Sequence, residues 1–130
     1  MKQVSISVGL SLLLLALLGA CDYGKPGGEA KKASAGDSAL MAPASSPGRM
    51  NNDDGVGHFQ QAHWDVASDY FRKAIKADPN LAEAHYNLGV TLDKMGKHDE
   101  ATASFKKAAE LAPTKPEIKD SPILKKHIGM

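Results

Sequence analysis

Few residues in this sequence have side chains that could carry out chemistry, and their spacing does not point to a reaction. Cys21 is the only cysteine, so neither an internal disulfide nor a cysteine-based metal site can form. No serine or threonine lies in a glycine-flanked nucleophile turn, and Gly55-Val56-Gly57 is too short to cradle a phosphate. No ligand spacing that predicts zinc or haem appears among the five histidines, His58, His63, His85, His98 and His127. We therefore expect a protein that is not an enzyme and that has no metal and no dissociable cofactor.

Composition and charge exclude further classes of protein. The chain has 130 residues and a formal net charge of +1. Binding of nucleic acid needs a basic face or stripe, which the short pairs Lys31-Lys32 and Lys125-Lys126 do not supply. Aromatic residues make up only 5% of the chain, so we expect one small domain. We therefore do not expect nucleic acid to be the partner.

The N-terminal residues have the layout of a secretory signal. Met1-Lys2 is positively charged, and residues 4–20 are almost entirely apolar. This apolar block is slightly shorter than the roughly 20 residues of a membrane-spanning helix, and it ends in small residues. The boundary Leu18-Gly19-Ala20-Cys21 resembles the bacterial lipobox, in which a branched apolar residue and two small residues precede cysteine. Residues 1–20 are therefore predicted to be a lipoprotein signal peptide; the alternative is an ordinary signal peptide in which Cys21 is coincidental.

This resemblance implies that Cys21 becomes the mature N-terminus and carries the lipid. In that family a thioether joins the cysteine sulfur to diacylglycerol, and the amine commonly receives a further acyl chain such as palmitate. Two or more acyl chains hold a protein stably on a bilayer. We therefore expect a lipid anchor in the bacterial cell envelope, outside the cytoplasm and thus facing the periplasm in a two-membrane cell. Asp22 resembles an inner-membrane retention signal that does not hold in all groups, so inner and outer membrane both stay open.

A flexible linker is expected between this anchor and the domain. Residues 21–50 comprise Cys21 and a stretch rich in glycine, alanine, serine, proline and lysine. Such a composition buries too little apolar surface to offset the entropy of ordering. As a coil, the linker would span roughly 30 Å on average.

The rest of the chain, residues 51–130, is predicted to be a repeat domain. The shift that superimposes Gly55 on Gly89 also superimposes Phe71 on Phe105 and gives several further identities without a gap. In the second copy, apolar residues at helical spacing predict one helix over residues 81–94 and another that ends near residue 111.

Residues 82–115 resemble a tetratricopeptide repeat. The family pattern has Leu-Gly in the first helix and a small residue in the turn. Alanine, a large aromatic residue, alanine and proline then follow in the second helix and at its exit. Here these places are filled by Leu88, Gly89, Gly96, Ala101, Phe105, Ala108 and Pro113. The resemblance implies packing roles: Gly89 and Ala101 allow close helix approach, Phe105 fills the gap between repeats, and Pro113 sets the direction in which the chain leaves the second helix.

Residues 48–81 resemble a degenerate first copy of this repeat. Its first helix has two glycines and no apolar face, so only about residues 56–62 are expected to be helical. A closing helix is expected at about residues 122–128, where Ser121-Pro122 has the form of an N-cap and first helical position. The predicted fold is an all-α, short tetratricopeptide-like stack of helical hairpins with a C-terminal closing helix.

The resemblance also implies a face on the concave side, lined by the first helix of each repeat, that binds another protein or a peptide and not a small-molecule substrate. The residues carried over to it are Glu83, Tyr86, Asn87, Val90, Asp93, Lys94 and Phe59. The chaperone-binding clamp of some members is not supported, because Tyr86 and Val90 stand at its lysine and asparagine positions. We expect a non-catalytic, lipid-anchored scaffold or assembly factor. The alternative is a structural accessory subunit of a larger envelope complex that folds on docking, since stacks of this type usually need about three repeats.

Overall fold

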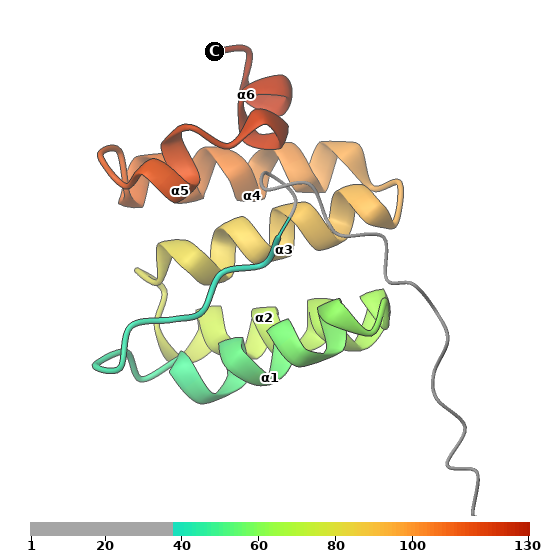
Figure 1. Cartoon of the computed structure of the whole chain (residues 1–130), viewed down its shortest axis with the longest axis vertical. Coiled ribbons are helices and arrows are strands. Elements are labelled where there is room, and N and C mark those ends of the chain that lie inside the picture. Colours follow the sequence, from blue (N-terminus) through green and yellow to red (C-terminus); the bar gives the residue numbers. More distant parts are fainter. Residues whose placement is uncertain (1–37) are drawn as a thin grey trace, which may run out of the picture.

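The computed structural model describes residues 38–130 of the chain, and every regular element within them is a helix (Figure 1). The predictions for the signal peptide, for Cys21 and Asp22, and for the linker up to residue 37 lie outside these residues. The all-α prediction is confirmed for the described range. Its helices are α1 Arg49–Gln60, α2 Trp64–Ala77, α3 Ala82–Lys94, α4 His98–Leu111, α5 Pro116–Lys119 and α6 Pro122–Ile128.

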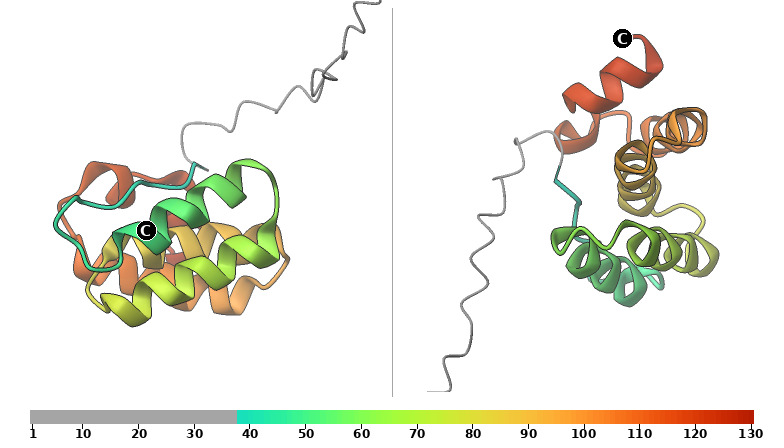
Figure 2. Two further views of the ribbon diagram at one scale, coloured as in Figure 1. Left: turned by 90° about the horizontal axis from the view of Figure 1, so that it is seen from below. Right: turned by 90° about the vertical axis from the view of Figure 1, so that its right-hand side faces the viewer.

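The helices form a curved stack of antiparallel hairpins. Helices α1 and α2 form the first hairpin, α3 and α4 the second, and α2 packs on α3 to join them. Helix α6 then covers α4. Seen end-on, the helices follow a curve, and residues 38–48, which precede α1, run along the open side of that curve (Figure 2).

Each hairpin closes where a glycine on its first helix meets a phenylalanine on its second. A Cβ atom on Gly89 would lie 2.8 Å from Phe105 Cδ1, and one on Gly55 would lie 2.6 Å from Phe71 Cε1. Both phenylalanines are fully buried. Because glycine has no side chain, the backbone of the first helix comes into direct contact with the ring of the second.

Both hairpins turn through a left-handed residue at equivalent positions of the repeat. Gly96 has φ +75°, and Ala62, its counterpart in the first repeat, has φ +59°. In each turn the amide that follows this residue reaches back to the helix: His63 N–H donates to the His58 carbonyl, and Lys97 N–H to that of Leu92. The amide of the left-handed residue bonds as well, Ala62 N–H to the Phe59 carbonyl and Gly96 N–H to that of Asp93. The two bonds together define a Schellman motif, whose left-handed residue is usually glycine.

The structure corrects the prediction for the first helix of the first repeat. Residues 56–62 were expected to be helical, whereas α1 begins at Arg49 and ends at Gln60. The sequence offers no continuous apolar stripe here, but tertiary contacts bury Asn52, Val56 and Phe59. Packing of this kind, more than intrinsic propensity, stabilises most protein helices.

The folded domain also begins earlier than the sequence indicates. Residues 38–50 were expected to belong to the flexible linker, yet α1 starts within them and an extended segment precedes it. The Ser46 hydroxyl donates to Asp78 at the end of α2 at 2.6 Å, and Gly48 N–H donates to the Ser46 hydroxyl. Hydrogen bonds to the helices therefore order a stretch whose composition suggested a coil.

Two short helices close the stack at its C-terminal end. Helix α6 starts as expected, with the Ser121 hydroxyl accepting from Leu124 N–H and Pro122 at the first helical position. Helix α5 was not expected; it buries Ile118 against the stack. Among the helices that the structure describes, none is both long and apolar enough to cross a membrane.

Candidate functional site

The concave side of the stack is formed by α1 and α3, the first helices of the two hairpins. Asp53 on α1 and Asn87 on α3 stand at equivalent positions of the two repeats. Asn52 and Asn87 are both fully buried. Polar side chains in such positions need hydrogen-bond partners, and the chain that precedes α1 supplies them. We call residues 38–42 the groove segment.

The backbone of Leu40 is the centre of this arrangement. Its N–H donates to Asn87 Oδ1 at 2.7 Å, and its carbonyl accepts from Asn87 Nδ2 at 2.7 Å. The same carbonyl accepts from Asn52 Nδ2 at 2.9 Å. Asn87 Nδ2 also donates to Asn52 Oδ1 at 2.9 Å, which links α1 to α3 beneath the segment. Two carboxamides thus satisfy both backbone groups of one residue.

A second backbone contact follows two residues later. Ala42 N–H donates to Asp53 Oδ1 at 3.1 Å, and Arg49 holds the other carboxylate oxygen at 3.3 Å. Successive residues of an extended chain point to opposite sides, so Leu40 and Ala42 present their amides to the same face. The equivalent residues Asn87 and Asp53 therefore each accept one backbone N–H hydrogen bond, and the donors are alternate residues of the extended segment.

The groove segment changes the interpretation of the predicted binding residues. Tyr86, Asn87 and Val90 were expected on a free concave face, but each is at most 1% exposed. Asn87 lies under Leu40, and the Tyr86 hydroxyl lies 2.9 Å from Ser121 Oγ, within the closing segment. Phe59 is buried as well and packs edge-on against Trp64. These residues belong to the interior of the folded domain because residues from both ends of that domain cover the predicted face.

The three charged residues predicted for this face lie in different surroundings. Glu83 is buried and forms an ion pair with Lys115, which precedes α5. Lys94 is exposed at the end of α3. Asp93 lies against two histidines, which are described below. No common surface of the described domain unites the three.

The predicted packing residues of the second repeat lie where the hairpin closes. Leu88, Ala101, Phe105 and Ala108 are buried between α3, α4 and their neighbours. Pro113 is exposed and follows the end of α4. His85 has its Nε2 3.0 Å from the Pro79 carbonyl.

A cluster of possible metal ligands was missed by sequence reasoning. Asp93, His98 and His127 each offer one ligand atom, and these atoms lie within 4.8 Å of one another. Burial alone would raise the pKa of Asp93, but hydrogen bonds and charge from His127 and His98 outweigh it and hold that pKa below its usual value. Asp93 and His98 are close in sequence, but His127 joins them only when α6 folds onto the stack. The spacing of the three residues in the sequence therefore gave no indication of the cluster.

These features define a class: a helical-hairpin repeat stack with an extended segment bound along its concave side. Residues 82–115 match the family model described as tetratricopeptide repeat, and residues 58–96 match one described as TPR repeat. The two matches support a tetratricopeptide repeat protein, as the sequence pattern indicated. Repeats of this kind generally mediate binding to other proteins or peptides and are typically non-catalytic.

Two curated proteins resemble parts of the chain. Protein bimA of Emericella nidulans is 43% identical over 51 residues, which is 39% of this chain. The protein named O-mannosyl-transferase Tmtc2 of Drosophila melanogaster is 39% identical over 61 residues, or 46% of this chain. The aligned part covers 6% of each relative's length. The likeness therefore concerns a short segment of two much longer proteins.

Proposed function

We propose that this chain is a non-catalytic protein-binding module, lipid-anchored in the bacterial cell envelope, that acts as a scaffold or assembly factor. Its concave groove takes an extended peptide, and in the resting state its own groove segment fills that groove. The observation that supports this is the hydrogen bonding of Leu40 to Asn87 and Asn52, with Ala42 bound to Asp53. All of these contacts go to backbone atoms of the segment, so a different extended chain could make them too.

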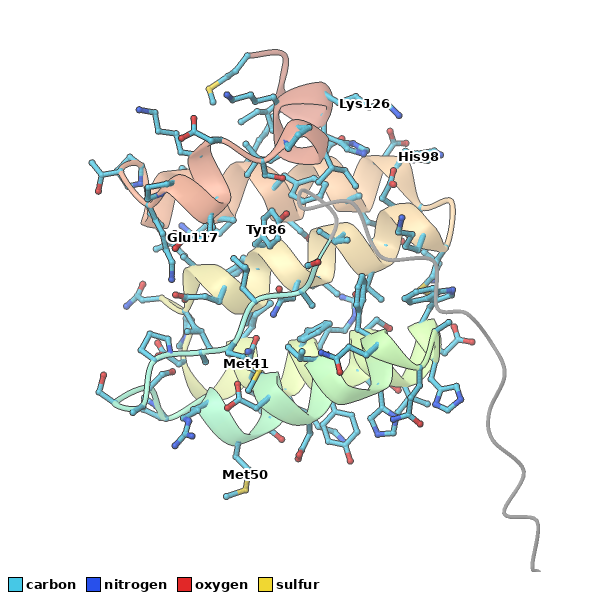
Figure 3. All side chains as sticks on the ribbon, in the orientation of Figure 1. Met41, Met50, Tyr86, His98, Glu117 and Lys126 are labelled. Carbon is cyan, nitrogen blue, oxygen red and sulfur yellow. The ribbon has the colours of Figure 1, made fainter. Side chains whose placement is uncertain are left out.

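A partner peptide would have to displace the groove segment. Each hydrogen bond contributes roughly 0.5–1.5 kcal/mol net, and the segment makes four to the groove, through Leu40 and Ala42. Met41 between them is 59% exposed, so the segment is not fully enclosed (Figure 3). A partner that makes the same backbone contacts and adds side-chain contacts of its own would therefore compete successfully.

The proposed anchor and the groove segment are connected along the chain. Residues 22–37 join Cys21 to Ser38, the first residue of the segment. Lipid on Cys21 would hold the groove close to the membrane surface, where a membrane-associated partner is concentrated. This arrangement favours a scaffold over the alternative of a subunit that folds only on docking, because the groove segment already completes the two-repeat stack.

Displacement can be tested with a proline substitution in the full chain. Leu40→Pro removes the backbone N–H that donates to Asn87 Oδ1. Met41→Pro removes a backbone N–H that makes no hydrogen bond within residues 38–130. The probe is a fluorescently labelled peptide with the sequence of residues 38–43, and its binding is measured by fluorescence anisotropy. We expect the Leu40→Pro chain to bind the probe at least tenfold more tightly than the parent, and Met41→Pro to match the parent. If no form binds the peptide, or if both variants bind alike, the proposed groove function is wrong.

Anchoring is tested separately. The intact mass of protein extracted from membranes is expected to begin at Cys21 and to include acyl chains. Cys21→Ser is expected to lack this mass. A Cys21→Ser protein that still partitions with membranes and is still cleaved at the same bond would contradict the anchor and leave the groove measurement unaffected.

A further inference from the structure

Three metal-ligand side chains from three helices meet at one end of the stack. Asp93 lies in the last turn of α3, His98 begins α4, and His127 lies in α6. Asp93 Oδ1 is 3.0 Å from His98 Nδ1 and 2.9 Å from His127 Nε2. The two imidazole rings have their centroids 6.0 Å apart and their planes inclined by 29°. Figure 3 shows labelled His98 at the end of the stack that also carries α6.

Thr102 fixes the orientation of the His127 ring. Its hydroxyl donates to the His98 carbonyl at 2.9 Å, one helical turn earlier. The single hydroxyl proton is then used, so Thr102 Oγ1 accepts from His127 Nδ1, 2.9 Å away. In the neutral ring this leaves the lone pair of Nε2 directed at Asp93 Oδ1. Two acceptor atoms this close require a proton or a metal cation between or beside them.

The surroundings match a zinc-type site. The His127 and Asp93 side chains are only 7% and 18% exposed, whereas His98 is 65% exposed and can adjust by rotation. Two histidines and one carboxylate are a common protein ligand set for zinc, with water in the fourth position. A hydrogen bond from the second nitrogen of a ligand histidine, here to Thr102, is a regular feature of such sites.

We propose that Asp93, His98 and His127 bind one divalent transition-metal ion of the zinc class. The ion would join α6 to the turn between α3 and α4, so that the closing helix is fastened to the second repeat by coordination as well as by packing. Nitrogen ligands exclude calcium and magnesium, which prefer oxygen. The proposal does not depend on the groove, because the cluster shares no residue with the contacts of the groove segment.

The test uses the full chain in detergent after removal of metal with a chelator. Isothermal titration with ZnCl2 is expected to give one saturable site, and added zinc is expected to raise the melting temperature. CoCl2 is expected to give the visible absorption of tetrahedral cobalt, while MgCl2 and CaCl2 have no effect. Absence of a one-to-one site for zinc would overturn the proposal and leave a hydrogen-bonded Asp–His cluster.

Variants assign the binding to these residues. His98→Gln changes an exposed side chain, so the fold is retained, and it is expected to abolish the saturable site. His85→Gln, a histidine outside the cluster, is the control and is expected to bind zinc like the parent. Thr102→Val is expected to weaken binding about 10- to 100-fold, and Thr102→Ser to restore it. Zinc binding unchanged in His98→Gln would overturn the assignment.

Discussion

The Asn87 carboxamide holds both backbone hydrogen-bonding groups of Leu40, accepting from its N–H and donating to its carbonyl, each at 2.7 Å. Its second donor is directed to Asn52 Oδ1. An amide side chain is suited to this because it combines an acceptor oxygen with two N–H donors. The contact is partly buried and joins residues 47 positions apart, so it links the N-terminal edge of the domain to the middle of the stack.

Asn87→Asp is expected to release the groove segment. The carboxylate keeps the acceptor for Leu40 N–H but loses both donors, and it places negative charge beside the Leu40 carbonyl and Asn52 Oδ1. Unsatisfied buried groups cost about 1–3 kcal/mol, so urea unfolding should show a loss of that order. Hydrogen exchange at the Leu40 amide should accelerate. Asn51→Asp, on α1 and without a side-chain hydrogen bond in the described domain, is the control. Unchanged protection of Leu40 in Asn87→Asp would contradict the arrangement.

Tyr86 and Ser121 are expected to be energetically coupled. Their hydroxyl oxygens are 2.9 Å apart and buried, and Ser121 also caps α6. Tyr86→Phe should cost about 1 kcal/mol of unfolding free energy, and Ser121→Ala about 1–2 kcal/mol because the cap is lost as well. The double variant should cost less than the sum by at least 0.5 kcal/mol, roughly the coupling expected of residues in contact. Simple additivity in urea denaturation would show that the hydroxyls do not interact.

The second repeat could be predicted from sequence because its determinants are local. Gly89, Gly96 and Phe105 occupy fixed positions in a short pattern, and each has its structural role within one hairpin. The first repeat was predicted only in part. Its Asn52 and Asp53 look unfavourable for a buried helix, and only the groove segment, an extended stretch without periodicity, supplies the contacts that they need.

The same reasoning explains why the covering of the concave face was not predicted and why the ligand cluster was missed. The family pattern places Tyr86 and Asn87 on the first helix of a repeat, which is correct, but it contains no information on what covers that helix. His127 joins Asp93 only because α6 packs back on α4. A signal did exist for the groove: polar Asp53 and Asn87 occupy the same position in the two repeats.

Two glycines within helices are expected to respond to alanine with opposite signs. A Cβ at position 89 would lie 2.8 Å from the Phe105 ring, whereas a Cβ at position 57 meets nothing within 4 Å. Gly57→Ala should stabilise the domain by about 0.5–1 kcal/mol through helix propensity alone. Gly89→Ala gains the same propensity but overpacks the hairpin, at about 1–3 kcal/mol, so its net effect is a loss. Thermal melts of both variants followed by circular dichroism measure this; shifts of the same sign would show that Gly89 is not a packing position.

The turns after α1 and α3 allow a reciprocal exchange at one repeat position. Ala62 and Gly96 are equivalent, and both adopt positive φ in a Schellman turn. A Cβ costs about 1–2 kcal/mol in this conformation, and glycine avoids that cost but loses about 0.4–1 kcal/mol through greater freedom of the unfolded chain. Ala62→Gly should therefore stabilise the domain by roughly 0.5–1 kcal/mol, and Gly96→Ala should destabilise it by a similar amount. Apart from its chain neighbours, a Cβ at position 96 would meet nothing within 4 Å, so the loss there reflects backbone conformation and not crowding. Equilibrium unfolding in urea measures both changes, and the double exchange should return close to the parental stability because the turns are separate. Destabilisation by Ala62→Gly would mean that the first turn is not left-handed in solution.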